Sequence, residues 1–193
     1  MPDLTDTPDH ELVRQMRAGT AAAFQALYRR HQGPLFRFAL LRCGAEATAA
    51  DVVQDTFMAL LTGSIQFDPL KGALGPFLFG VARNLILKHE AARQRYARLP
   101  GEDEDDEPDL ASDAAEPLDQ LLGQETADAV RRALGQLAPH YRDVLILYEL
   151  HELSYLEIAQ ICQVDLGTVR SRLSRARSQL AKRLLAHRSG APA

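Results

Sequence analysis

The 193-residue sequence has few cysteines and no long hydrophobic run, and each absence excludes a class of protein. Cys43 and Cys162 lie far apart without a further ligand at metal-binding spacing, so neither a disulfide framework nor a zinc site is indicated. We expect both to be small buried residues. No uncharged apolar run approaches the roughly 18 residues of a membrane span, and the polar, acidic N-terminus is unlike a signal or transit peptide. The sequence therefore predicts a cytosolic protein without membrane insertion.

The motifs of the common enzyme classes are missing as well. The sequence contains neither a Walker-type phosphate loop nor a G-x-S-x-G nucleophile elbow, and no cysteine lies near a histidine in sequence. His151-Glu152 begins like a zinc-protease motif, but Tyr155 stands where the second histidine is required. We therefore predict no catalytic residue, no metal and no cofactor. The sequence leaves open only a catalytic triad built from distant residues.

Basic residues are absent from one acidic segment, and this changes the meaning of the net charge. The chain has 22 basic and 26 acidic residues, which gives a formal charge of −4. Ten of the acidic residues lie between Glu102 and Asp119, so the remaining 16 leave the rest of the chain at +6. Together with Pro100, Gly101 and Pro108, this run of like charge indicates an extended linker over residues 98–120. The linker divides the chain into two lobes, residues 9–97 and 121–187.

Both lobes are predicted to be helical, because apolar residues recur at spacings of three and four and no stretch alternates like a strand. The predicted fold class is all-α, with two small helical domains. In the first lobe we expect a helix capped by Asp9 and closed by Gly19, then a segment from Pro34 to Gly44. After a turn, Pro76 begins another helix, whose predicted core residues are Phe77, Leu78, Val81 and Leu85.

A helix from about Glu46 to Leu61 separates apolar from polar side chains clearly. At 100° per residue, one face carries Val53, Phe57 and Leu60. The opposite face carries Asp51, Gln54, Asp55 and Met58. The first three of these polar-face residues have i, i+3, i+4 spacing, which suits a partner helix that bears Arg or Gln. A solvated polar face is the alternative.

The second lobe has the outline of a helix-turn-helix. Pro139 fits the first position of a helix. Ser154 and Glu157 form a capping box for a short helix, which a turn at Gln163 ends. Asp165 then caps a long helix, whose inward residues are Val169, Leu173, Ala176 and Leu180.

The outward face of this long helix places small residues between arginines. It consists of Gly167, Arg170, Ser171, Ser174, Arg177 and Ser178, with Arg175 at its border. Small residues allow the helix backbone to approach the major groove closely. Arginine can donate two hydrogen bonds to guanine, which discriminates between bases by about 1–3 kcal/mol. The face therefore predicts DNA binding, and a solvated arginine-rich face is the alternative.

Three motifs in one order resemble a known family. They are Ala50–Phe57; Phe67–Pro69 with Pro76–Leu85; and Leu153–Ala159 with Gly167–Arg177. Over residues 10–186 the chain resembles a bacterial RNA polymerase sigma factor of the sigma-70 family, in the extracytoplasmic function (ECF) group. The resemblance implies a two-domain protein that binds core polymerase and promoter DNA for transcription initiation.

The resemblance assigns the first lobe to polymerase and to the promoter −10 element. Asp51, Gln54 and Asp55 would dock on the clamp helices of the polymerase beta-prime subunit. Residues 67–88 would read the −10 element and assist strand opening, through Phe67, Lys71, Arg83, Asn84 and Lys88. The chain departs from the family at Phe77, where many members have Trp, and at Gly80, where a basic residue is usual. Glu90-Ala91-Ala92 also interrupts the usual basic run.

The resemblance assigns the second lobe to the −35 element. The base-reading candidates are Arg170, Ser171, Ser174 and Arg175, and the further DNA-contacting candidates are Thr168, Arg172 and Arg177. Gln163 stands where the family has the usual turn glycine, which would be mildly strained in a left-handed conformation. The linker would thread through the polymerase active-site channel, the polymerase beta flap is a further expected partner, and an anti-sigma factor is the expected regulator.

Two other interpretations remain at this point. One is a freestanding helix-turn-helix regulator whose first lobe senses a signal or dimerises. The other is a helical scaffold whose basic helix binds an acidic protein. Promoter-dependent transcription by core polymerase would separate both from a sigma factor.

Overall fold

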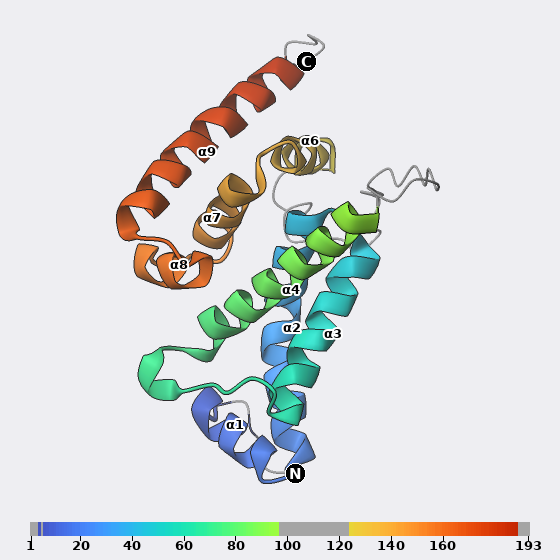
Figure 1. Cartoon of the computed structure of the whole chain (residues 1–193), viewed down its shortest axis with the longest axis vertical. Coiled ribbons are helices and arrows are strands. Elements are labelled where there is room, and N and C mark those ends of the chain that lie inside the picture. The colour runs from blue at the N-terminus through green and yellow to red at the C-terminus, as the bar shows by residue number, and fades with distance from the viewer. Residues whose placement is uncertain (1–3, 5, 97–123, 189–193) are drawn as a thin grey trace. The chain divides into compact units, whose positions relative to one another are not determined.

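The computed structural model describes residues 4, 6–96 and 124–188, and it forms two compact units. Among the described residues, one unit comprises residues 4, 6–39 and 47–96, and the other comprises residues 40–46 and 124–188. Every regular element within the described ranges is helical, which confirms the predicted all-α class (Figure 1). None of the described helices is long and apolar enough to cross a membrane. The acidic segment between Glu102 and Asp119 lies outside the described residues.

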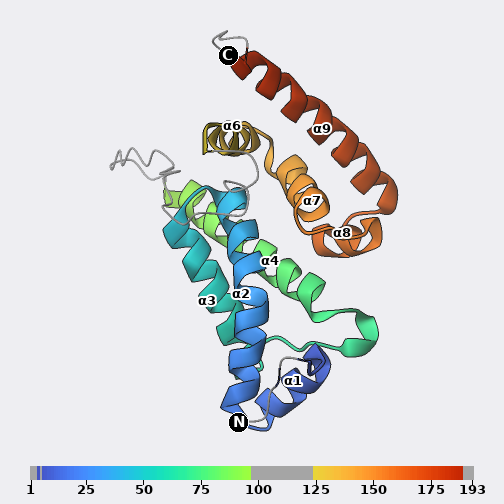
Figure 2. The ribbon, with the colours of Figure 1, turned by 180° about the vertical axis from the view of Figure 1, so that it is seen from behind.

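The first unit contains α1 (Asp9–Arg17), α2 (Ala21–Cys43) as far as Ala39, α3 (Glu46–Thr62) from Ala47 onward, the short 3-10 helix η1 (Pro69–Lys71) and α4 (Leu74–Tyr96). α2, α3 and α4 lie alongside one another in both views of the chain (Figure 1, Figure 2). Aromatic rings join them, since Phe24 of α2 meets Phe57 of α3 edge to face and Phe38 of α2 meets Phe79 of α4 in the same way. Burial of Phe38, Phe57 and Phe79, which are almost fully enclosed, contributes about 1.5–3 kcal/mol each, whereas Phe24 is half-buried.

Pro34 does not begin a new helix, so the predicted break there is wrong. α2 runs without interruption from Ala21 to Cys43 with Pro34 inside it. Leu27, Leu35 and Phe38 are all fully buried on both sides of the proline. Proline in a helix interior costs about 3 kcal/mol. The apolar face that continues across it offsets this cost.

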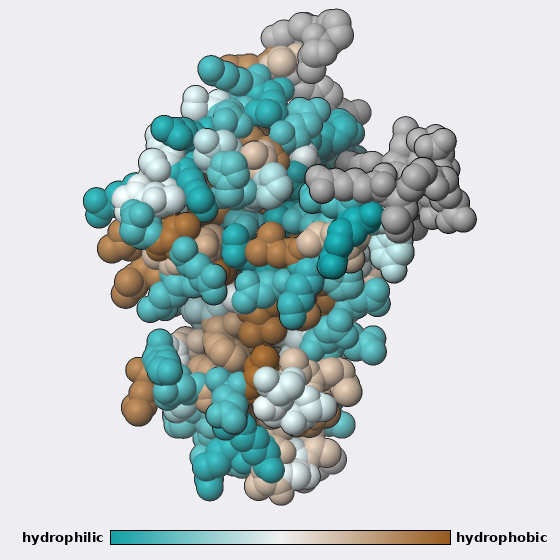
Figure 3. Space-filling model, in the orientation of Figure 1, coloured by the Kyte–Doolittle hydropathy of each residue, from teal (hydrophilic) through white to brown (hydrophobic). Residues whose placement is uncertain are grey.

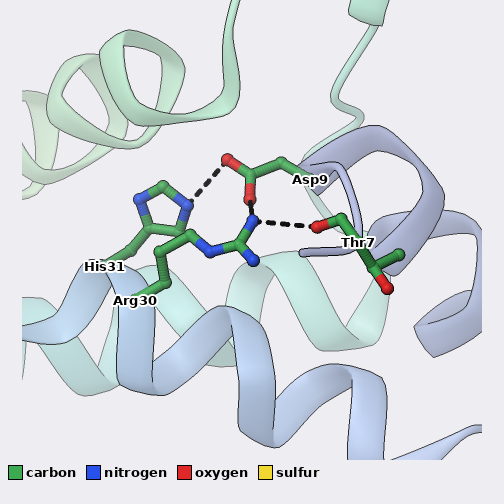
Figure 4. A network of polar contacts seen from close by, with 4 residues as sticks. All are labelled: Thr7, Asp9, Arg30 and His31. Atoms are coloured by element: carbon green, nitrogen blue, oxygen red, sulfur yellow. Dashed lines mark hydrogen bonds and ion pairs between the residues drawn. The ribbon is translucent and has the colours of Figure 1, made fainter. Parts of the chain in front are cut away.

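Asp9 is not the N-cap of α1, which corrects a second prediction. Pro8 occupies the cap without a side-chain hydrogen bond, and Asp9 is the first helical residue. The Asp9 carboxylate instead accepts hydrogen bonds from Arg30 and from His31 Nε2, the latter at 2.9 Å (Figure 4). Arg30 also donates to the Thr7 carbonyl at 3.1 Å. Burial raises the pKa of Asp9, but the hydrogen bonds and charges of His31 and Arg30 outweigh it and hold that pKa below its ordinary value.

α4 begins two residues before the predicted Pro76, and its core set differs from the prediction. Leu78 is buried as expected, but Phe77, Val81 and Leu85 are only half-buried. The fully enclosed residues are Leu74, Leu78, Phe79, Ala82 and Ile86. The buried stripe is therefore rotated by about one residue. The two cysteines differ in a similar way, because Cys162 is buried as predicted while Cys43 is half-buried.

The second unit contains α6 (Gln124–Gly135), α7 (Pro139–Glu149), α8 (Tyr155–Cys162) and α9 (Leu166–Arg188), and α9 packs against the other three. Pro139 is the first helical residue of α7, as predicted. The predicted capping box is also present: the Ser154 N–H donates to Glu157 Oε2 at 2.8 Å, and the Glu157 N–H donates to Ser154 Oγ at 3.3 Å. Val169, Leu173 and Ala176 are buried as expected, whereas Leu180 is half-buried.

The turn between α8 and α9 is tight. Gln163 caps α8 in the left-handed conformation, with φ of 56° and ψ of 49°. We expect mild strain if the residue in place of the usual turn glycine is left-handed, and Gln163 adopts this conformation. Two residues on, the Asp165 carboxylate accepts the Thr168 N–H at 2.8 Å and so caps α9 as predicted. The unit is therefore a helix-turn-helix with a cap at the start of each of its two helices.

Candidate polymerase and DNA surfaces

The polar face of α3 is fully separated from its core face. Asp51, Gln54 and Asp55 are exposed, while Val53 and Phe57 are buried. Within the described residues, no hydrogen bond or ion pair is recorded for the first three side chains. The predicted polymerase-binding residues therefore share one surface and are available to a partner.

A groove between α2 and α3 lies beside this polar face. Its volume is about 570 Å³, and its lining is mostly apolar, with Phe24, Tyr28, Phe36, Gln54 and Met58 among its residues. The rings of Tyr28 and Phe57 lie 4.8 Å apart at its floor. An apolar groove next to two carboxylates is the surface that an amphipathic helix with basic residues would fit.

The side chains predicted to contact the −10 element differ in solvent exposure. Lys71, Asn84 and Lys88 are exposed, Arg83 is half-buried, and Phe67 is buried with its ring 5.6 Å from that of Phe77. Asn84 and Lys88 lie one turn apart on α4. The structure thus leaves three polar side chains open to a ligand, while Phe67 serves the local core.

Leu70, which sequence reasoning did not select, is the most exposed large apolar side chain of the described residues, at 95 %. It lies in η1, where Asp68 Oδ1 accepts the Leu70 N–H at 3.0 Å. Figure 3 shows hydrophobic surface at this loop between α3 and α4. The sequence did contain a signal for this exposed residue. Turns are usually polar, so a leucine next to Lys71 in a turn is unusual.

The predicted DNA-contacting residues of α9 fall into two groups by exposure. Arg170, Ser171, Ser174, Arg175 and Arg177 are exposed, while Thr168 and Arg172 are half-buried. The Thr168 hydroxyl donates to Asp165 Oδ2 at 2.9 Å, and the Ser171 hydroxyl donates to the Thr168 carbonyl at 3.1 Å. The hydrogen bond from the Thr168 N–H holds the pKa of Asp165 below its ordinary value. The capping carboxylate is therefore ionised at neutral pH, next to the exposed arginine and serine stripe.

Two of the exposed arginines contact other helices of the unit. The Arg170 guanidinium lies 5.9 Å from the ring centroid of Tyr155, and that of Arg177 lies 5.1 Å from the ring of Tyr148. Arg177 Nε also donates to Glu149 Oε1 at 2.7 Å. Sequence reasoning missed both tyrosines and Glu149. The sequence carries a faint signal, since the tyrosines and the two arginines are each separated by seven residues.

No metal centre accompanies these surfaces in the described ranges, which hold no group of three His, Cys, Asp or Glu side chains able to bind an ion. The geometry is that of binding surfaces: one polar and apolar on the first unit, one basic on the second.

Comparison with protein-family models finds a match in each of the two units. The model of Sigma-70 region 2 matches residues 27–96, and the model of Sigma-70, region 4 matches residues 127–180. The first match includes α3, the loop and α4, and the second includes the helix-turn-helix. Two helical units that match these models in this order define the class of sigma factors built from regions 2 and 4.

Individual relatives narrow this class. The chain is 31 % identical over 196 residues to ECF RNA polymerase sigma factor SigE of Mycolicibacterium smegmatis, covering 96 % of this chain and 71 % of that protein. It is 30 % identical to ECF RNA polymerase sigma factor SigM of Mycobacterium tuberculosis, covering 91 % and 84 %. It is 31 % identical to RNA polymerase sigma-H factor of Pseudomonas aeruginosa, covering 94 % and 96 %. The chain belongs to the ECF group of the sigma-70 family.

Solved structures give the same result at the level of fold. A sigma factor RpoE, crystallised with the anti-sigma factor NepR from Bartonella quintana, is similar with a TM-score of 0.65 and 27 % identity. The similarity covers 83 % of this chain and 96 % of that one. CnrH, in complex with the cytosolic domain of CnrY, is similar with the same TM-score and identity over 92 % and 97 % of the two chains.

Proposed function

We propose that this sigma factor binds core RNA polymerase through its first domain and directs it to promoters that its two domains read together. The first domain spans residues 9–97 and the second spans residues 121–187. The observation that carries the proposal is the exposed arginine and serine stripe on α9, within the segment that matches region 4. A basic stripe with small residues on a recognition helix is suited to the major groove.

The polymerase-binding surface of the proposal is the polar face of α3 together with the adjacent groove. Asp51, Gln54 and Asp55 offer hydrogen-bond acceptors to the basic residues of a helix, and the groove offers apolar area for the same helix. In this proposal the occupant is a clamp helix of the beta-prime subunit. The polymerase beta flap is the partner proposed for the second domain.

Promoter contacts are divided between the two domains in this proposal. Phe67, Lys71, Arg83, Asn84 and Lys88 serve the −10 element, with Phe67 acting as packing support because it is buried. The second domain reads the −35 element, with the contacts assigned to Thr168, Arg170, Ser171, Arg172, Ser174, Arg175 and Arg177. Base-edge contacts by arginine would carry most of the sequence preference, and contacts to phosphate would carry the salt dependence.

The remaining parts of the proposal concern regulation and the linker. The protein acts in the cytoplasm and has no catalytic residue of its own. An anti-sigma factor holds it inactive, which is supported by similar structures that contain sigma factors bound to anti-sigma factors. The acidic run between Glu102 and Asp119 repels phosphate, so the free protein binds duplex DNA poorly until polymerase holds the linker elsewhere.

Transcription reconstituted from purified components tests the proposal. Core polymerase with this protein should start transcripts from a subset of genomic fragments, and mapped start sites should share two upstream elements. Core polymerase alone is the control. A freestanding helix-turn-helix regulator or a helical scaffold would not restore promoter-specific initiation to core polymerase. Equal transcription with and without this protein would therefore refute the proposal.

The linker has its own test. Removal of residues 102–107 should raise the DNA affinity of the free protein and make that affinity fall more steeply with salt, because the repulsion that salt screens is gone. Unchanged affinity and salt dependence would show that the acidic run does not inhibit DNA binding.

A further inference from the structure

Five side chains form a cluster that joins three helices of the second unit. We call it the ring cluster: Tyr148 and Glu149 at the end of α7, Tyr155 at the start of α8, and Arg170 and Arg177 on α9. The two tyrosine rings lie 5.3 Å apart with their planes 35° from parallel. Each ring carries one arginine, at 5.9 Å for Arg170 and 5.1 Å for Arg177.

Within the ring cluster, Arg177 has both a ring contact and an ion pair, whereas a ring contact is the interaction described for Arg170. Arg177 lies over Tyr148 and also pairs with Glu149, its Nε donating to Oε1 at 2.7 Å. The hydrogen bond to Glu149 raises the pKa of Arg177, so the guanidinium keeps its charge at physiological pH. Arg177 therefore ties α9 to α7, and Tyr148 fixes the position of the second ring.

Arg170 has a different environment. It lies over Tyr155, is exposed, and lies five residues after the capping residue Asp165, in the first two turns of α9. A guanidinium stacked through its face keeps the N–H groups of its edge available. Those edge donors are the groups that hydrogen-bond two acceptors of guanine in the major groove. Stacking and base contact are therefore compatible for the same side chain.

We propose that Tyr155 is a positioning residue for base recognition: its ring orients the Arg170 guanidinium toward the DNA before the complex forms. This rests on the proposed function, since it assumes that α9 reads a promoter element. A free arginine side chain has several rotatable bonds. Ordering it on binding costs conformational entropy, which weakens the affinity and reduces the preference for one base over another. The ring performs part of that ordering in advance. Tyr155 acts through Arg170, and the ring alone is needed.

The experiment uses holoenzyme reconstituted from core polymerase and the full-length protein. DNA carrying a randomised −35 region is selected for binding, and the base preference at each position is obtained by sequencing. Arg170→Ala identifies the position that Arg170 reads, because preference is lost there. Tyr155→Leu should reduce the preference at that same position by about two- to fivefold, the range expected for a cation–π contact at an exposed site. Tyr155→Phe should retain it.

Matched controls separate positioning from stability. Leu156→Ala changes the exposed neighbour of Tyr155 on the same helix and should leave every position unchanged. The thermal unfolding midpoint of each variant is measured alongside. A merely structural role of Tyr155 would lower the midpoint and weaken all positions alike, and this result would overturn the proposal.

The other outcomes are equally decisive. Full preference in Tyr155→Leu would overturn the positioning role. A uniform loss of affinity in Tyr155→Phe, with Tyr155→Leu showing the same uniform loss and no added loss at the position of Arg170, would assign Tyr155 a phosphate contact through its hydroxyl in place of the positioning role, which also overturns the proposal. If wild-type holoenzyme shows no base preference at any position, the proposed function itself has failed. A failure of the inference alone would leave the wild-type preference intact.

Discussion

The two predicted binding faces, on α3 in the first unit and on α9 in the second, are built in different ways. On α3 the predicted polymerase-binding side chains form no hydrogen bond or ion pair with another described residue, and the core residues occupy the opposite side of the helix. On α9 two of the functional arginines also contact α7 and α8 through aromatic rings and an ion pair. The side chains of the α3 face thus have no polar contact with the other described residues of their unit, whereas two arginines of the α9 face contact neighbouring helices of theirs.

This difference indicates how each face would tolerate change. Substitutions on the polar face of α3 should alter binding with little effect on stability, because they remove no hydrogen bond or ion pair within the described residues. Substitutions in the ring cluster should alter both. A protein that must recognise an invariant polymerase and a specific promoter would benefit from this division, since only the DNA-reading face needs side chains fixed in direction.

The largest expected effect tests the separation of core and surface on α3. Phe57→Ala should destabilise the protein by about 3–5 kcal/mol, because the ring is 2 % exposed and its removal leaves a cavity. The next residue, Met58, is 47 % exposed, and Met58→Ala should change the unfolding free energy by no more than about 0.5 kcal/mol. Urea denaturation of both variants measures the contrast. Similar values for the two would mean that the faces are not separated.

A second prediction tests whether the α3 face is independent of its scaffold. Asp51→Arg combined with Asp55→Arg should weaken binding to core polymerase roughly tenfold or more, because like charges then meet across the interface. The unfolding midpoint should hardly move, since neither carboxylate pairs with another described residue. Competition binding and thermal denaturation supply the two measurements.

The control for this charge reversal is Glu46→Arg, an exposed acid at the start of the same helix. Binding reduced equally by Glu46→Arg would show a general charge effect in place of a defined docking surface. A large fall in stability of the double variant would show that the α3 face does support the fold.

A third prediction concerns the capping box of the helix-turn-helix. Ser154→Ala should destabilise the second unit by about 1 kcal/mol, because the Glu157 N–H loses its acceptor. Ser154→Asp, which restores an acceptor, should recover most of this loss. Chemical denaturation monitored on residues 121–187 by hydrogen exchange measures it. Equal stability of Ser154→Ala and the wild type would show that the box makes no net contribution.

The smallest expected effect lies in the first unit and depends on pH. Since the folded pKa of Asp9 is below its ordinary value, its contacts stabilise the protein above that ordinary value, near 3.8, and the contribution disappears as pH falls through the folded pKa. Asp9→Asn should therefore cost up to about 1 kcal/mol at neutral pH and nothing in strong acid. Unfolding free energies at pH 7 and at pH 3 and below give the comparison. A cost that does not change with pH would contradict this account.

Local signals in the sequence were sufficient for part of this molecule. Pro139, Ser154 with Glu157, and Asp165 each act within three or four residues, and each does in the structure what the sequence predicts. The two faces of α3 also follow from a spacing of 3.6 residues per turn. Residue-level promoter contacts stay predictions, as do the domain boundaries.

Contacts between distant residues account for the predictions that were wrong or missing. Asp9 binds Arg30 and His31, which are 21 and 22 residues away, so its use as a cap could not be excluded locally. Pro34 stays inside α2 because buried residues on both sides hold the helix together. The ring cluster joins residues up to 29 positions apart on three helices, and the seven-residue spacing of its tyrosines and of its arginines does not by itself show that they meet.

The caps of the helix-turn-helix have a consequence for the order of folding. Ser154 with Glu157 and Asp165 with Thr168 each close a loop of three residues, so the two helix starts can form before any distant contact exists. Helix nucleation is the slow local step, and both caps favour it. A chain emerging from the ribosome would then present an ordered turn while α9 is still being completed. We expect Ser154→Ala to slow refolding more than it speeds unfolding, which stopped-flow kinetics would measure.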